Sequence, residues 1–242
     1  MQTPSPNTPA EAPPVAGFWA RYAAWSLDAA CLLPLVALLC ASKVSYALAA
    51  ARTALQAIAS GLPGALGEAL ATLQAPTDMA RQLLADPTMA TAVDRLESAL
   101  GSLLFTPVLV YVVLALPWSV LFEQSRWQAT PGKRALGLVV ADAQGRRLKA
   151  GHALLRHLGA GLSWLTLNLG HAMAALPPRH LALHDRISDT RVLQRAGPGR
   201  LPAWARGWIA LQAMAVLFAS GWAFVWLHAA MQAAMEQALG PF

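Results

Sequence analysis

The stretch FWARYAAWSLDAACLLPLVALLC, residues 18–40, decides the fold class of this chain. Residues 22–42 are almost entirely apolar, and about 20 such residues are enough for a helix to cross the hydrocarbon core of a membrane. Asp28 is the only formally charged residue among them. A carboxylate inside a membrane helix is costly, so it normally faces protein or a wet cavity and marks a functional site. The stretch therefore predicts an integral membrane protein with a polar site around Asp28.

The first helix alone cannot satisfy Asp28. Arg21 lies seven residues earlier on nearly the same face, but about 10 Å away along the axis, so the two side chains cannot pair within the helix. We expect Arg21 to extend toward headgroups or water and Asp28 to find a partner elsewhere in the protein. Two roles follow for Asp28: a packing residue that holds helices together, or a group that helps to move an ion or a solute.

The composition of the chain agrees with a membrane location. Of its 242 residues, 56% are hydrophobic and 12% are charged, whereas globular soluble domains carry about 25% charged residues. The net charge of +6 comes from loops that flank apolar segments, which favours contact with a bilayer containing anionic headgroups and argues against a nucleic-acid partner. Cys31 and Cys40 fall on opposite faces of the first helix, so we expect free structural thiols.

Two further segments are predicted to span the membrane. Residues 100–122 contain no charge and are long enough for one crossing. A final apolar helix and tail occupy residues 207–242, after a linker at residues 196–206. Residues 1–15 hold five prolines and almost no large apolar side chain, which predicts a disordered tail.

An alanine-rich insert, residues 43–99, separates the first two spans and carries four basic and five acidic residues. A nearly neutral segment of this kind suits translocation across the membrane. Residues 62–64 and 86–87 are typical of helix boundaries. We therefore expect three or four amphipathic helices packed on the outer face of the membrane. A sharper alternative is that the insert forms a lid over the polar site.

A third apolar run, residues 157–178, decides the topology. The loops on either side of it, residues 124–149 and 179–206, each carry six basic residues, and basic loops prefer the cytoplasmic side. A single crossing by residues 157–178 would place one of these loops outside. A re-entrant segment that turns near Asn168 would keep both loops inside, provided that protein or water covers its backbone. We favour the re-entrant interpretation.

The predicted fold class is an all-α integral membrane protein. It has three full transmembrane helices, one re-entrant or transmembrane helical segment, the amphipathic helical insert, and a small cytoplasmic β-like hairpin formed by strand-like pieces around Val139 and Val192. With both basic loops inside, the N-terminus is cytoplasmic, and the insert and the C-terminus are outside. Three or four helical passes make a thin wall for a pore, so a homo-oligomer is a candidate assembly.

Several motifs together resemble the RDD family of bacterial membrane proteins, which is named for one arginine and two aspartates. The matching pieces are Gly17-Phe18-Trp19-Ala20-Arg21 with Leu27-Asp28, residues 130–138 (TPGKRALGL), the Asp142-x-x-Gly145 turn, Ala153-Leu154-Leu155-Arg156, and Leu183-His184-Asp185-Arg186 followed by Thr190-Arg191-Val192. In order and spacing they cover residues 16–195, which we take as the RDD-like membrane domain. The long insert and the final helix depart from the compact core of the family.

The resemblance assigns Arg21 and Asp28 to the first two named positions and Asp185 to the third. It implies a multi-pass protein of the bacterial inner membrane. Transport of an ion or small solute is suggested for such proteins, and cation/proton exchange is attributed to some members. Two hypotheses follow: a carrier in which Asp28 exchanges a proton for a cation or accompanies a solute, and a non-transporting scaffold or assembly protein in which Asp28 holds helix packing.

Asp185 also has two interpretations. It could meet the cytoplasmic mouth of a cavity at Asp28, or it could pair with a loop arginine at the membrane interface. Its neighbours His184 and Arg186 are predicted to be supporting polar groups.

Two more supporting groups, Asn168 and His171, lie in the third apolar run and could hydrogen-bond across to Asp28. His180 and His184 are spaced as metal ligands on one helix face, but the adjacent arginines would repel a cation, so we expect no metal.

The sequence carries no nucleophile elbow, metalloprotease motif or dinucleotide-binding glycine pattern. We therefore expect no cofactor and no enzymatic activity.

Overall fold

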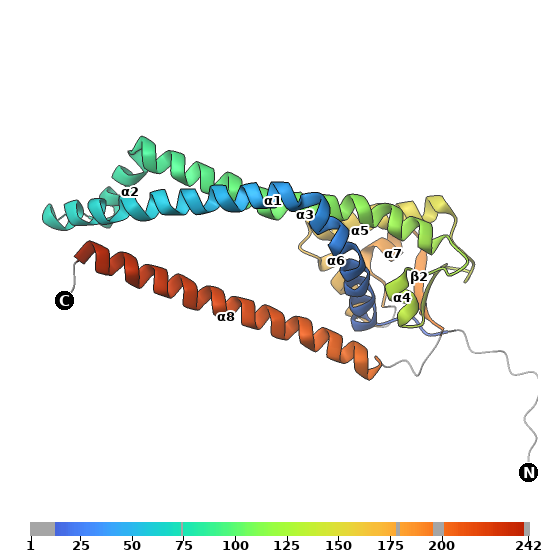
Figure 1. The fold of residues 1–242 in the computed structure, drawn as a ribbon. Coiled ribbons are helices and arrows are strands. Elements are labelled where there is room, and N and C mark those ends of the chain that lie inside the picture. The colour runs from blue at the N-terminus through green and yellow to red at the C-terminus, as the bar shows by residue number, and fades with distance from the viewer. Residues whose placement is uncertain (1–12, 74, 178–179, 196–200, 240–242) are drawn as a thin grey trace, which may run out of the picture. The chain divides into compact units, whose positions relative to one another are not determined.

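The computed structural model describes residues 13–73, 75–177, 180–195 and 201–239 (Figure 1). The elements follow in the order α1 (Phe18–Ala71), α2 (Pro76–Ala85), α3 (Pro87–Glu123), α4 (Pro131–Ala135), β1 (Leu138–Asp142), α5 (Ala150–Leu165), α6 (Leu169–Ala172), the 3₁₀ helix η1 (Met173–Ala175), α7 (Leu183–Ile187), β2 (Thr190–Gln194) and α8 (Ala203–Leu239). The predicted tail lies mostly outside the described residues, as do residues 196–200 of the predicted linker.

Three helices in the described part of the chain are long and apolar enough to cross a membrane. They are the segments Phe18–Ala69 of α1, Pro87–Glu123 of α3 and Ala203–Ala229 of α8. This confirms the three predicted spans and, together with the small sheet, the fold class in outline. Each helix extends beyond the residues expected for it, since α1 alone has 54 residues, or about 80 Å, where a hydrocarbon core is about 30 Å thick.

Residues 43–99 contain the end of α1, all of α2 and the start of α3, and the helix boundary expected at residues 62–64 is wrong. The helix α1 continues through Pro63 to Ala71, α2 is a single helix of 10 residues, and α3 begins directly behind it. A proline removes one backbone hydrogen bond from a helix interior. The alanine-rich sequence on both sides of Pro63 has a high helix propensity, which explains why the helix is not interrupted there.

The boundary predicted at residues 86–87 is confirmed. Pro87 is the first residue of α3, and the carboxylate of Asp86 accepts hydrogen bonds from the backbone N–H groups of Thr88 (2.7 Å) and Met89 (3.0 Å). A side-chain oxygen in this place satisfies donors that have no partner within the helix. This cap explains why α3 begins here and not at the apolar stretch that follows.

The chain divides into two compact units, which we describe separately. The first unit comprises Met1–Leu33 and Val112–Ile209, and the second comprises Pro34–Tyr111 and Ala210–Phe242. In the second unit, α1 and α3 bury small side chains, among them Ala47, Ala51 and Ala92. Gly61 of α1 lies against Met89 of α3, since a Cβ atom at Gly61 would approach the Met89 side chain to 2.8 Å. Small residues allow the two helix backbones to approach closely.

The sheet of the first unit pairs two strands that are far apart in the sequence. β1 and β2 are antiparallel, and Val140 lies opposite Val192, which confirms the predicted pairing of the strand-like pieces. Both valines are buried in a core with Leu138 and with Ala20 and Ala24 of α1. Paired strands lie on the same side of a membrane, so this pairing agrees with the re-entrant interpretation of the chain between them, which stays a prediction.

The third apolar run is not one membrane-length helix. α5 ends at Leu165, and Leu167 and Asn168 then adopt positive φ angles of 50° and 64°, after which only the short helices α6 and η1 follow. Asn tolerates this left-handed conformation better than most residues. The chain therefore turns where the re-entrant interpretation places a turn, and the insertion of this turn into a bilayer stays a prediction.

Candidate functional site

Asp28 is buried in the first unit, with 7% of its surface exposed. Its carboxylate accepts hydrogen bonds from the Thr130 hydroxyl (2.5 Å), the Gly132 backbone N–H (2.8 Å) and the Trp118 indole N–H (3.3 Å). These three donors satisfy an acidic group that an apolar helix alone would leave without partners. The predicted polar environment of Asp28 thus comes from α3 and from the start of α4.

The sequence Thr-Pro-Gly-Lys at residues 130–133 explains why α4 can approach Asp28. Thr130 is the N-cap of α4, and its side chain accepts from the Lys133 N–H (3.5 Å), while Pro131 occupies the first helical position, where no N–H is required. At Gly132, a Cβ atom would lie 2.9 Å from the Asp28 carboxyl carbon and would also collide with the carbonyl oxygen of Ala24. Glycine is therefore needed for this close contact with α1.

Asp185 is the centre of a second buried group of charges. Its side chain is fully buried and forms ion pairs with Arg21 (2.5 Å) and with Arg156. Its carboxylate also accepts from the backbone N–H of Ala182 (3.0 Å), at the start of α7. Asp185 thus joins α1, α5 and α7 through a single side chain.

Arg21 does not extend toward headgroups or water as expected. Besides its pair with Asp185, its guanidinium donates to the carbonyl oxygens of Ala16 (2.9 Å) and His180 (3.0 Å). A buried carboxylate requires a cationic partner. Arg21 is such a partner for Asp185, although the two residues are 164 positions apart in the chain. Asp185 accordingly pairs with arginines of α1 and α5, and no loop arginine in the described part of the chain pairs with it.

The ion pairs continue from Asp185 toward α4. Arg156 also lies 3.4 Å from Glu123, and Glu123 pairs with Lys133 at 2.6 Å. Since Lys133 also donates its N–H to Thr130, the surroundings of Asp28 and of Asp185 belong to one connected network. This buried charge network consists of Arg21, Asp28, Glu123, Thr130, Lys133, Arg156 and Asp185.

Sequence reasoning did not assign a site role to four members of this network, namely Glu123, Thr130, Lys133 and Arg156, or to Trp118, which donates to Asp28. One signal for Arg156 was available, because it follows Ala153 and precedes Gly159 at a spacing of three, and all three residues are buried on α5. An arginine on a helix face of small residues indicates an internal ion pair. The partners of Asp28 left no such signal, since they depend on how α3 and α4 pack against α1.

The electrostatics of Asp185 favour its ionised form. Burial by itself would raise the pKa of the Asp185 carboxyl, but the guanidinium groups of Arg156 and Arg21 hold this pKa well below its usual range. Burial and the nearby charge of Arg156 lower the pKa of His184 well below its ordinary value. At neutral pH the network therefore contains a charged Asp185 beside a neutral His184.

Among the described residues, the expected hydrogen bonds from Asn168 and His171 to Asp28 are absent. The His184 ring lies 3.5 Å from the Asp185 carboxylate and 5.1 Å, between ring centroids, from the His171 ring, so both histidines belong to the surroundings of Asp185. Asn168 and Arg186 are exposed. In the described part of the chain, Asp28 hydrogen-bonds to none of these four residues.

The first unit thus defines an integral membrane protein in which a buried charge network ties one end of α1 to a small cap of short helices and strands. The chain belongs to the RDD family, a family of membrane proteins whose model matches residues 15–189. This match confirms the resemblance drawn from the motifs. The matched residues include every member of the charge network, among them Arg21 and Asp185.

One relative is YxaI, an uncharacterised protein of Bacillus subtilis (strain 168). The two sequences are 34% identical over 95 residues, which is 39% of this chain and 62% of YxaI. The chain therefore matches less than two thirds of the length of this relative. No solved structure matches the chain.

Proposed function

We propose that the protein is a non-transporting, non-enzymatic membrane scaffold whose charge network fastens the short helices and strands of the first unit to the ends of α1 and α3. The observation that carries this proposal is that intramolecular donors occupy both carboxylates. Asp28 accepts from three groups, and Asp185 accepts from two arginines and one backbone N–H. A carboxylate that carries a solute must exchange its partners in each cycle, and breaking a buried ion pair costs about 3–5 kcal/mol.

A second candidate is transport of an ion or small solute, with cation/proton exchange at Asp28. The observation that favours it is the position of Asp28 within the apolar part of α1, where an acidic group is costly and commonly functional. In this candidate, the Asp28 carboxylate would exchange its hydrogen bonds to Thr130 and Gly132 for a cation in one part of each cycle. The two candidates differ in what happens to the hydrogen bonds of Asp28. These bonds persist in a scaffold, whereas a carrier breaks and re-forms them in each cycle.

The experiment that separates them uses the purified full chain in lipid vesicles that contain a pH-sensitive dye. A scaffold shows no pH change when Na⁺, K⁺ or Ca²⁺ is added outside, whereas a known exchanger in the same vesicles does. The Asp28→Asn variant should unfold at a lower temperature, since it weakens the bonds to Thr130 and Gly132, while Asp189→Asn at an exposed position should not. A cation-driven pH change that disappears in Asp28→Asn, with unchanged unfolding temperature, would overturn the scaffold in favour of the carrier.

We further propose that the protein lies in the bacterial inner membrane with its N-terminus in the cytoplasm. The support is the charge of the loops at residues 124–149 and 179–206, each with six basic residues, and the tendency of such loops to stay inside. The pairing of β1 with β2 agrees with this orientation, because each of these loops contains one of the two strands. The re-entrant turn at Asn168 and a homo-oligomeric assembly are parts of the same proposal.

A further inference from the structure

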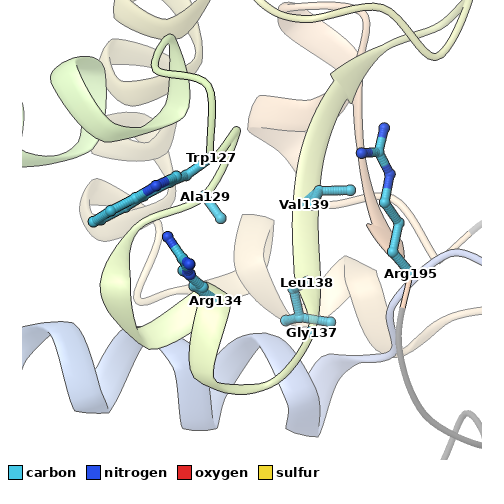
Figure 2. A pocket seen from close by; sticks show the side chains of 7 residues that line it. All are labelled: Trp127, Ala129, Arg134, Gly137, Leu138, Val139 and Arg195. Atoms are coloured by element: carbon cyan, nitrogen blue, oxygen red, sulfur yellow. The ribbon is translucent and has the colours of Figure 1, made fainter.

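A cavity of about 190 Å³ lies beside β1 in the first unit, outside the charge network. Trp127, Arg134 and Arg195 contribute its polar and aromatic groups, and Leu138 and Val139 of β1 contribute its apolar wall. Figure 2 shows the side chain of Arg134 next to the Trp127 ring and places Arg195 across β1 from them. We call this site the arginine cavity.

The charges of the arginine cavity are not neutralised. The Arg134 guanidinium lies 4.2 Å from the centroid of the Trp127 ring, a cation–π contact that leaves its positive charge in place. Neither Arg134 nor Arg195 forms an ion pair in the described part of the chain, whereas Arg21, Lys133 and Arg156 all do. Two arginines that line one cavity, neither with a counter-ion among the described residues, favour an anionic ligand.

A backbone donor also faces the arginine cavity. Val140 of β1 donates its N–H to the carbonyl oxygen of Gln128 (2.7 Å), on the side away from β2, while Arg195 donates to Gly137 (3.0 Å) across the sheet. Since N–H groups alternate in direction along a strand, the Leu138 N–H points to the same side as that of Val140. Two arginine forks and one amide N–H are the groups that proteins use to bind phosphate.

The position of the cavity indicates where its ligand comes from. Trp127 lies four residues after the end of α3, and its ring stacks on that of Phe122, near the end of the α3 span, with 5.6 Å between centroids. Tryptophan is enriched at the level of lipid headgroups. The Phe122–Trp127 contact therefore ties the arginine cavity to the membrane boundary, where phosphate groups of lipids are abundant.

We propose that the arginine cavity binds the phosphate of an anionic phospholipid headgroup. The Arg134 guanidinium and the Leu138 N–H hold the phosphate oxygens on the side of β1 that faces away from β2, and the Arg195 guanidinium reaches toward them from across β1. Trp127 lies at the level of the glycerol and upper acyl region. The bound lipid would orient the first unit against the membrane. This site is separate from the charge network and does not depend on the scaffold role proposed above.

The test compares two double variants that remove equal charge. Arg134→Gln with Arg195→Gln changes the cavity, whereas Arg186→Gln with Arg191→Gln changes two other exposed arginines of the first unit. Binding of phosphatidylglycerol to the detergent-purified full chain is measured by native mass spectrometry, with phosphatidylcholine as the comparison lipid. We expect the cavity variant to bind phosphatidylglycerol about 30-fold more weakly than the wild type. The control variant should remain close to the wild type, and phosphatidylcholine should bind weakly to all three.

Three results would overturn the proposal. Equal losses in both double variants would show a diffuse effect of net charge. Displacement of the lipid by millimolar inorganic phosphate would show that the cavity takes free phosphate in place of a headgroup. The third result concerns a double variant that keeps both charges, Arg134→Lys with Arg195→Lys, which can also be used if the glutamine double variant unfolds. This lysine variant should retain most of the affinity for phosphatidylglycerol. A loss of affinity as large as that expected for the glutamine variant would contradict a phosphate contact.

Discussion

At the scale of single residues, Asp185 shows why a buried charge is stable only beside counter-ions and hydrogen-bond donors. Its carboxylate is fully buried, and two arginines and a backbone N–H take the place of the water molecules that would otherwise bind it. Taking ions out of water costs several kcal/mol each, and the ion pair offsets this cost only while both partners are present. Removing the carboxylate leaves Arg21 and Arg156 buried side by side with the same charge.

We predict that Asp185→Asn lowers the free energy of unfolding by about 3–5 kcal/mol, because it leaves the buried Arg21 without its counter-ion and Arg156 with Glu123 alone. Thermal unfolding of the detergent-purified protein, followed by tryptophan fluorescence, measures this change. Asp189→Asn is the control, since Asp189 is exposed and its positive φ of 47° suits Asn as well as Asp. Equal shifts in the two variants would contradict the structural role of Asp185.

The same residue predicts how stability depends on pH. Arg156 and Arg21 overcome the effect of burial and hold the pKa of Asp185 below its value in the unfolded chain, which is about 3.9. The unfolded chain therefore takes up a proton before the folded protein does, so the stabilisation is present above about pH 4 and is lost as the pH falls further. Unfolding temperatures between about pH 7 and pH 3 should decrease more for the wild type than for Asp185→Asn.

At the scale of elements, the contact between α4 and α1 depends on a missing side chain. Gly132 brings its N–H to Asp28 at 2.8 Å, and the backbone of α4 lies where a Cβ atom would meet Ala24 and Asp28. The short helix α4 has only five residues and cannot shift without losing the bonds of Thr130 and Gly132. The Thr-Pro-Gly-Lys motif is thus a docking element for α1.

We predict opposite effects for two glycine-to-alanine changes in helices. Gly132→Ala should destabilise the protein by about 1–3 kcal/mol because of overpacking against α1. Gly151→Ala in α5 should be neutral or stabilise by up to about 1 kcal/mol, since a Cβ atom there meets nothing within 4 Å and alanine favours helices. Unfolding temperatures of the two variants provide the measurement, and a stabilised Gly132→Ala would contradict the close contact.

At the scale of the whole molecule, the pairing of β1 with β2 restricts the topology. The five paired positions, from Leu138 with Gln194 to Asp142 with Thr190, require both strands to lie on one side of the membrane. We therefore predict that the segment between them, with its turn at Asn168, returns to the side from which it started. This reasoning uses only the first unit, which contains both strands and the turn.

Cysteine labelling tests this topology in intact cells. In a chain without Cys31 and Cys40, single cysteines replace three exposed residues: Gln144, Arg186 and Arg81. We predict that Gln144→Cys and Arg186→Cys react with a membrane-impermeant reagent only after the cells are opened, whereas Arg81→Cys reacts from outside. Labelling of Gln144→Cys and Arg186→Cys from opposite sides would contradict the paired strands.

Sequence reasoning reached the long helices, the strand pair and the turn near Asn168 because their signals are local. Apolar length indicates the spans, β-branched residues near glycine turns indicate the strands, and Asn-Leu-Gly indicates a turn. It failed at residues 62–64, where a proline and a glycine predict an interruption of the helix. There the helical preference of many alanines outweighs one lost hydrogen bond.

By itself, the sequence determined that this chain is a membrane protein of the RDD pattern with an acidic residue inside its first span, because hydropathy, helix length and motif order are properties of the linear chain. Only the tertiary structure decided which groups satisfy Asp28 and Asp185. Their partners lie from 3 to 164 positions away in the sequence. A buried carboxylate binds the donors that packing brings within hydrogen-bond distance, and that packing involves α1, α3, α4, α5 and α7 together.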